Sequence, residues 1–213
     1  MKDIPVFDTD TGVSTLLLKE IPYKQTAYVK VQSVQPGGLA EHLHECVSFC
    51  RMCGAERILA QGHPELEGYK VHCSVLQMRL AVPAMEPPAM VFPVTEATVR
   101  RWREIYNRRM EGVDNAATLT AFDEKRIVAS GGACFVHDCG RLLGIGWMEE
   151  NALLCLASVE PGAGERVLRT LLTLSDGGSV SLQVASTNTR AIRLYERLGF
   201  VTVGETEKWH QIF

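Results

Sequence analysis

The sequence lacks any long apolar run, any strong excess of one charge and any regular cysteine framework. No stretch approaches the roughly 20 apolar residues that a membrane-spanning helix needs, so we expect no membrane partner. The formal net charge of −3 gives no electrostatic reason to bind nucleic acid. The seven cysteines are odd in number and scattered, which favours reduced thiols in a cytoplasmic protein over a disulfide scaffold.

Prolines gather in one segment of the chain. Four of the nine lie within eleven residues, at Pro83, Pro87, Pro88 and Pro93. Proline fixes φ, removes a backbone donor and disfavours helix in the residue before it, so this segment is typical of an extended linker. We therefore predict two domains, residues 1–88 and residues 89–213.

Residues 89–213 alternate between helical and strand-like patterns. Apolar residues recur at helical spacing in some runs, and hairpin signals separate others. The expected helices cover 95–112, a stretch ending near 131, 165–174 and 188–198, and the expected strands cover 133–137, 141–148, 152–159, 179–185 and 200–203. This order predicts an α+β fold in which helices flank a mixed, mostly antiparallel central sheet.

The N-terminal half carries a similar pattern. A shift of 125 residues lays V-Q-S-V-Q-P-G-G, residues 31–38, on L-A-S-V-E-P-G-A, residues 156–163. Eight identities over some fifty positions can arise by chance, but the strand–turn–helix–strand order coincides as well. We therefore predict a smaller N-terminal α/β half-domain that is an internal repeat.

Two motifs in the C-terminal half resemble those of a known superfamily. N-T-R-A-I-R-L-Y-E-R-L-G-F, residues 188–200, resembles the second signature of the GNAT-type N-acetyltransferases: an Asn, an Ala three residues later, then Leu-Tyr and Gly-Phe. Upstream, E-P-G-A-G-E-R-V-L-R-T-L-L, residues 160–172, resembles their pyrophosphate-binding turn and helix. The resemblance covers roughly residues 92–213 and implies a GNAT-like domain that uses acetyl-CoA.

The resemblance also implies how the acyl donor binds. In the superfamily the strand before the turn, here 152–159, splays from its neighbour, and the pantetheine arm pairs with its free backbone edge. The turn suits a phosphate, because a helix start offers free N–H groups and a glycine lets the anion approach the backbone. The expected cofactor-binding residues are Ala157, Ser158, Val159, Gly162, Ala163, Gly164, Glu165, Arg166, Asn188, Ala191 and Tyr195.

Tyr195 is the expected catalytic residue. The resemblance implies that it lies near the thioester sulfur and acts as a general acid, since protonation removes the charge that develops on the departing thiolate. No residue stands out as the general base. Glu149, Glu150 and His137 are candidates, although a solvated hairpin is the simpler explanation of the two acids.

The implied reaction is acetyl transfer to a small-molecule or peptide amine, by direct attack in a ternary complex. One position departs from the family pattern. An Arg or Gln usually lies three residues before the first glycine, whereas this chain has Val159 there, and Arg166 is a candidate to supply the lost charge. The missing Arg or Gln and the missing base favour, as the alternative, a non-catalytic CoA-binding or sensing module.

A helix expected over 38–53 carries possible metal ligands on one face: His42, Cys46, Cys50 and Cys53. Ligands spread over three turns of a straight helix extend about 16 Å, so one ion cannot gather all four. Free cysteine behaves as a small hydrophobe. We therefore expect no metal site and interpret this face as core.

Two further features leave alternatives open. Five arginines make the helix expected over 95–112 basic, which indicates either a solvated face or an acidic acceptor beside it: Arg100, Arg101, Arg103, Arg108 and Arg109. The oligomeric state is also open, a homodimer included.

The N-terminal copy lacks most of the signature. It keeps the Pro36-Gly37-Gly38 turn, but His63 stands where the signature has Asn188, and no tyrosine aligns with Tyr195. We expect this copy neither to catalyse nor to bind CoA well, and to complete or shield the acceptor cleft.

Overall fold

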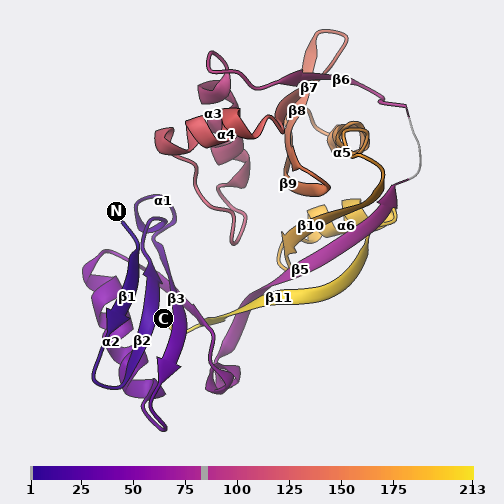
Figure 1. Ribbon diagram of the computed structural model, residues 1–213. Coiled ribbons are helices and arrows are strands. Elements are labelled where there is room, and N and C mark those ends of the chain that lie inside the picture. Colours follow the sequence, from indigo (N-terminus) through magenta and orange to yellow (C-terminus); the bar gives the residue numbers. More distant parts are fainter. Residues whose placement is uncertain (1, 83–85) are drawn as a thin grey trace. The chain divides into compact units, whose positions relative to one another are not determined.

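The computed structural model describes residues 2–82 and 86–213 (Figure 1). The chain forms two compact units. The first comprises Met1–Ser74 together with Thr206–Phe213, and the second comprises Val75–Glu205. No helix in the described parts of the chain is long and apolar enough to cross a membrane.

The first unit is a small sheet with one long helix. Its strands follow the order β1-β2-β3-β4-β11, with β3 and β4 parallel. These strands are β1 (Ile4–Asp8), β2 (Gly12–Leu17), β3 (Thr26–Val34), β4 (Arg57–Gln61) and the end of β11 (Val201–Gln211), and the helices are α1 (Ile21–Lys24), α2 (Leu39–Met52) and the 3-10 helix η1 (Pro64–Gly68). Leu39, Leu43, Cys46 and Cys50 of α2 are buried in its core, as expected for that face.

His42 on the same face of α2 is part of a buried polar cluster. Its Nδ1 lies 2.8 Å from Thr9 Oγ1, and its Nε2 lies 2.7 Å from Ser14 Oγ. Burial lowers the pKa of His42, which favours the neutral ring. Both ring nitrogens of His42 are therefore within hydrogen-bond distance of a hydroxyl group. These contacts help to hold α2 against the sheet.

The second unit is a larger mixed sheet with helices on both faces. Its strands follow the order β5-β10-β9-β8-β7-β6; β9 and β10 are parallel, and the other neighbours are antiparallel. The strands are β5 (Lys70–Val82), β6 (Met90–Pro93), β7 (Ala133–Asp138), β8 (Arg141–Glu149), β9 (Ala152–Ser158) and β10 (Gly178–Ala185), and the helices are α3 (Val99–Met110), η2 (Ala121–Asp123), α4 (Glu124–Ser130), α5 (Gly164–Leu172) and α6 (Thr189–Arg197). This architecture confirms the predicted α+β fold with a mixed central sheet.

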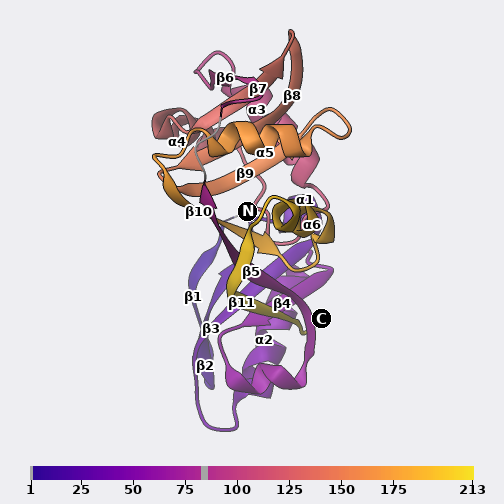
Figure 2. The same ribbon diagram turned by 90° about the vertical axis from the view of Figure 1, so that its right-hand side faces the viewer.

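Two apolar layers hold the helices to this sheet. Helices α3 and α4 cover one face of β7–β9, and α5 crosses the other (Figures 1 and 2). Trp102 of α3 is fully buried and meets Trp147 of β8 edge to face, with ring centroids 5.9 Å apart. On the opposite face a side chain at Gly146 would overlap Leu171 of α5, so this glycine sets how closely the helix packs.

Each unit includes a strand from the other half of the sequence. β10 pairs with β5 from Gly178↔Val82 to Ala185↔Val75, and β4 pairs with the end of β11 at His210↔Ala60. Under the 125-residue shift, Ala60 of β4 corresponds to Ala185 of β10, so β4 and β10 are matched strands. Each of the two pairs with a strand from the other repeat. Each compact unit therefore contains segments from both halves of the sequence. The division into repeats at residue 88 stays a prediction.

The proline-rich segment is only partly a connection. Met90–Pro93 forms β6 and pairs with β7 from Met90↔His137 to Pro93↔Cys134. Proline is tolerated on such an edge strand, because its missing N–H needs no ladder partner. Pro83 lies outside the described residues.

Candidate active site

β9 and β10 begin as parallel neighbours and then separate. Among the described residues they pair at two positions, Ser181↔Ala152 and Leu182↔Leu153. On its other side β9 stays paired with β8 as far as Ser158. The backbone edge of β9 after Leu153 therefore faces away from β8 without a strand beside it.

A β-bulge marks the point of separation. Leu153 lies opposite Met148 and Cys155 lies opposite Trp147, so Leu154 is an extra residue in β9. A bulge bends its strand and increases the local twist. The Leu154 side chain is 50% exposed, although both neighbours are buried. The bend at Leu154 explains why β10 stops pairing with β9 at this position.

The splayed end of β9 leads into the turn 159–163 and then α5. Gly162 has φ of +80°, and a side chain built there would meet nothing within 4 Å. No side chain caps the start of α5. A helix start without a cap leaves backbone N–H groups and the positive end of the helix dipole available to an anion.

The predicted residues around this turn have different roles in the structure. Ala157 is buried among the residues that pack against α3 and α4, while Ser158 lies opposite Gly144 at the end of the β8 ladder. Ala163 is the N-cap residue of α5. A Cβ on Gly164 would lie 3.3 Å from Leu194 Cδ2, so this glycine allows α5 to approach α6.

The charged residues at the start of α5 are engaged with other parts of the second unit. Glu165 lies 3.0 Å from Arg169 and 3.8 Å from Arg197. The guanidinium of Arg166 forms a 2.7 Å ion pair with Asp138 and donates two hydrogen bonds to the carbonyl oxygen of Pro88. A ligand phosphate would therefore have to compete with Asp138 for Arg166.

Helix α6 carries the second motif. Asn188 is its N-cap residue, and Asn188 Oδ1 accepts a hydrogen bond of 3.2 Å from the backbone N–H of Ala191. The Asn-x-x-Ala spacing therefore has a structural cause, because an N-cap oxygen reaches the third residue of its helix. The amide nitrogen of Asn188 has no hydrogen-bond partner in the described parts of the chain.

Tyr195 lies in the core between α6 and the sheet. It is 8% exposed, and its ring packs against Phe200 with centroids 5.7 Å apart. Burial raises the pKa of Tyr195, and the Cys155 thiol raises it further. Cys155 directly follows the bulge residue, so this interaction places Tyr195 beside the separation of β9 from β10. No group among the described residues hydrogen-bonds the Tyr195 hydroxyl.

Solved structures share this fold. A GCN5-related N-acetyltransferase from Sphaerobacter thermophilus is 15% identical, with 94% of this chain and 76% of the other aligned at a TM-score of 0.56. Another from Anabaena variabilis is 9% identical, with 93% of this chain and 59% of the other aligned at 0.60. A tandem GNAT protein from the clavulanic acid biosynthesis pathway is 16% identical, with 94% of this chain and 78% of the other aligned at 0.51. The chain has the GNAT fold. No protein-family model and no curated protein matches it.

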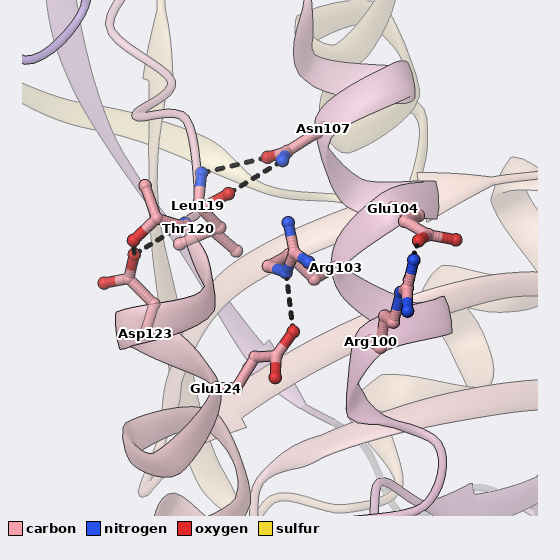
Figure 3. Close-up of polar contacts among 8 residues, drawn as sticks. All are labelled: Arg100, Arg103, Glu104, Asn107, Leu119, Thr120, Asp123 and Glu124. Atoms are coloured by element: carbon pink, nitrogen blue, oxygen red, sulfur yellow. Dashed lines mark hydrogen bonds and ion pairs between the residues drawn. The ribbon is translucent and has the colours of Figure 1, made fainter.

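In this GNAT fold, α3 and α4 and the segment between them lie on the sheet face opposite α5. Polar side chains fix this segment, as Figure 3 shows. Asn107 accepts from the N–H of Leu119 at 2.9 Å and donates to its carbonyl at 2.8 Å, and Arg103 pairs with Glu124 at 2.8 Å. Arg100 pairs with Glu104 at 3.1 Å on the exposed side of α3. The basic helix therefore carries several locally neutralised charges.

The candidate general bases lie away from the free edge of β9. Glu149 and Glu150 are exposed at the β8–β9 hairpin, and Glu149 lies opposite Ala152, before the bulge. His137 lies on β7, where its ring meets Phe92 and Phe135 with centroids 5.2 and 6.5 Å away. β8 separates β7 from β9, so His137 is not on the free edge.

In the first unit the matched strands β3 and β4 pair over a longer stretch than β9 and β10 do. β3 pairs with β4 from Thr26↔Arg57 to Lys30↔Gln61, and residues 31–34 of β3 continue beyond the end of β4. At the matching turn, Gly37 corresponds to Gly162; it has φ of +77°, and a side chain built there would likewise meet nothing within 4 Å. The first unit is therefore as open at this glycine as the second, and the two units differ in how far their matched strands pair.

The Asn188 cap gives a direct prediction. We expect Asn188→Ala to lower the free energy of unfolding by about 1 kcal/mol, because it removes the cap of α6. Asn188→Asp keeps a capping oxygen but not the amide donor, so it should lower the free energy of unfolding much less than Asn188→Ala does. Urea unfolding of the three proteins measures this difference. Equal destabilisation by both substitutions would contradict a capping role.

Proposed function

We propose that the protein is an acetyl-CoA-dependent N-acetyltransferase that acts on a primary amine. The observation that carries this proposal is the separation of β9 from β10 at Leu154, beside a buried tyrosine and before an uncapped helix start. The strand supplies an unpaired backbone edge for amides, the tyrosine supplies a proton donor for a sulfur, and the helix start supplies N–H groups for a phosphate. The GNAT fold of the chain supports the same assignment.

Acetyl-CoA fits these residues as the acyl donor. Its pantetheine arm contains amides, which would pair with the free backbone edge at Ala157, Ser158 and Val159. Its pyrophosphate would lie at the turn and the first residues of α5: Gly162, Ala163, Gly164, Glu165 and Arg166. The unpartnered amide nitrogen of Asn188 is a donor for a carbonyl of the arm, and Ala191 beside it adds no bulk.

The proposed reaction is a direct attack in a ternary complex. The neutral amine attacks the thioester carbonyl carbon, the C–N bond forms and the C–S bond breaks. Tyr195 donates its phenolic proton to the departing sulfur, the attacking nitrogen releases a proton to solvent, and the Tyr195 phenolate takes a proton back from solvent. Because burial raises the pKa of Tyr195, the phenol remains protonated at neutral and moderately alkaline pH, as a general acid requires.

The acceptor in this proposal is a small-molecule or peptide amine in a cytoplasmic setting. A second function, a non-catalytic CoA-binding or sensing module, has a specific observation in its favour. Glu149 and Glu150 are exposed in a hairpin, and His137 lies on β7, two strands from β9, so none of these candidates lies on the free edge of β9. Acetyl transfer then depends on solvent to take the amine proton.

We also propose that residues 1–88 are a degenerate copy and residues 89–213 the acetyltransferase domain. A first unit that does not bind CoA is supported by His63 in the place of Asn188 and by the absence of a tyrosine aligned with Tyr195. A protein described as a tandem GNAT is among the structures with this fold, which agrees with two related units in one chain.

The first test is calorimetric titration of acetyl-CoA. We expect binding by the wild type and at least a tenfold loss in Gly162→Asp/Gly164→Asp, because two carboxylates would repel the pyrophosphate. The matched control is Gly162→Asn/Gly164→Asn, which adds nearly the same bulk without charge. Loss of binding in the Asp variant alone would support the site, whereas equal binding by Asp and Asn variants would exclude it.

Tyr195 gives a second prediction. Tyr195→Phe keeps the ring in the core but removes the proton donor, so we expect turnover to fall roughly 100-fold while CoA affinity changes little. The raised pKa of Tyr195 also predicts that wild-type turnover does not decline until the pH exceeds 10, the usual tyrosine value. A thiol-release assay across pH measures both effects. Unchanged turnover in the Phe variant would remove Tyr195 from the mechanism.

A further inference from the structure

A guanidinium from α3 lies at the open end of the β9–β10 splay. Arg109 Nη2 donates a hydrogen bond of 2.7 Å to the carbonyl oxygen of Val159, the residue that follows β9. Arg109 is exposed and lies fifty residues earlier in the chain. The contact therefore brings a cation to the start of the turn 159–163, where the turn's own first side chain is an uncharged valine.

The direction of this carbonyl places Arg109 on the free side of β9. The N–H of Glu160 belongs to the same peptide group, and it points to Leu143 of β8 at 3.3 Å. In a trans peptide the C=O and the following N–H point in opposite directions. The Val159 carbonyl, and with it the Arg109 guanidinium, therefore lies on the side of β9 that faces away from β8.

Arg109 differs from the other arginines that lie on α5 or contact it, because those have carboxylate partners. Arg166 is bound to Asp138, and Arg169 and Arg197 both lie beside Glu165. Glu160 and Glu165 add negative charge to the turn itself. The Arg109 guanidinium, by contrast, has five N–H donors and contacts a neutral carbonyl; it pairs with no carboxylate among the described residues.

We propose that Arg109 binds the diphosphate of the acyl donor. Arginine suits this role because its planar fork binds phosphate oxygens in pairs, and one of its donors already fixes it at the mouth of the splay. Helix α3 thus supplies a positive charge that the residues of the turn do not. This inference rests on the proposed use of acetyl-CoA and assigns to its diphosphate a residue outside the turn and α5.

The test compares Arg109→Gln with Arg108→Gln in titrations of CoA. Gln at position 109 removes the positive charge and keeps a shorter polar side chain. Arg108 is exposed on the same helix and has no hydrogen bond or ion pair in the described parts of the chain, so it is the matched control. We expect Arg109→Gln to weaken CoA binding by roughly tenfold or more, and Arg108→Gln to change it little.

Salt dependence separates a charge effect from a structural one. Screening weakens interactions between exposed charges, so the wild-type affinity should fall more steeply with NaCl than that of Arg109→Gln. An Arg109→Gln affinity equal to or above the wild type would overturn the inference, and so would a loss that is the same at low and high salt. If the folded wild type bound no CoA at all, the proposed function itself would fail. If the wild type bound CoA and Arg109→Gln bound it equally well, only the role of Arg109 would fail.

Discussion

The candidate site depends on one extra residue in one strand. Leu154 is inserted between two residues of β9 that face consecutive residues of β8, and pairing with β10 ends immediately before it. In an uninterrupted parallel ladder the β9 edge would be covered and no ligand could reach its backbone. The bulge opens that edge, directs the strand into the turn before α5, and leaves the hydroxyl of Tyr195 beside the opening without a hydrogen-bond partner among the described residues.

The two units show what the sequence pattern alone does not determine. Both contain a strand, a Pro-Gly turn and a helix in the same order, and the shift of 125 residues aligns them without a gap. In the first unit β3 and β4 pair at five positions before β3 continues past the end of β4, whereas β9 and β10 pair at two among the described residues. The matched glycines Gly37 and Gly162 are equally open, so the two units differ in the length of strand pairing and in the residues of the second motif.

The local elements could be predicted from the sequence because helix and strand periodicities are local properties. The strands expected over 133–137, 141–148 and 152–159 differ from the observed ones by one residue at each altered end, and the mixed sheet flanked by helices is confirmed. The Leu154 bulge could not be predicted, since it depends on the register with β8. The contact of Arg109 with Val159 depends on tertiary packing across fifty residues, and the cap at Asn188 depends on where α6 begins.

Amide hydrogen exchange, measured with and without acetyl-CoA, tests the central claim most directly. The splayed edge of β9 has backbone groups that no strand covers, so a bound pantetheine arm should slow the exchange of amides in residues 154–158. Slower exchange should extend to the first turn of α5, while β3 of the first unit should be unaffected. Unchanged exchange in β9 at saturating acetyl-CoA, or protection confined to the first unit, would contradict this account of the site.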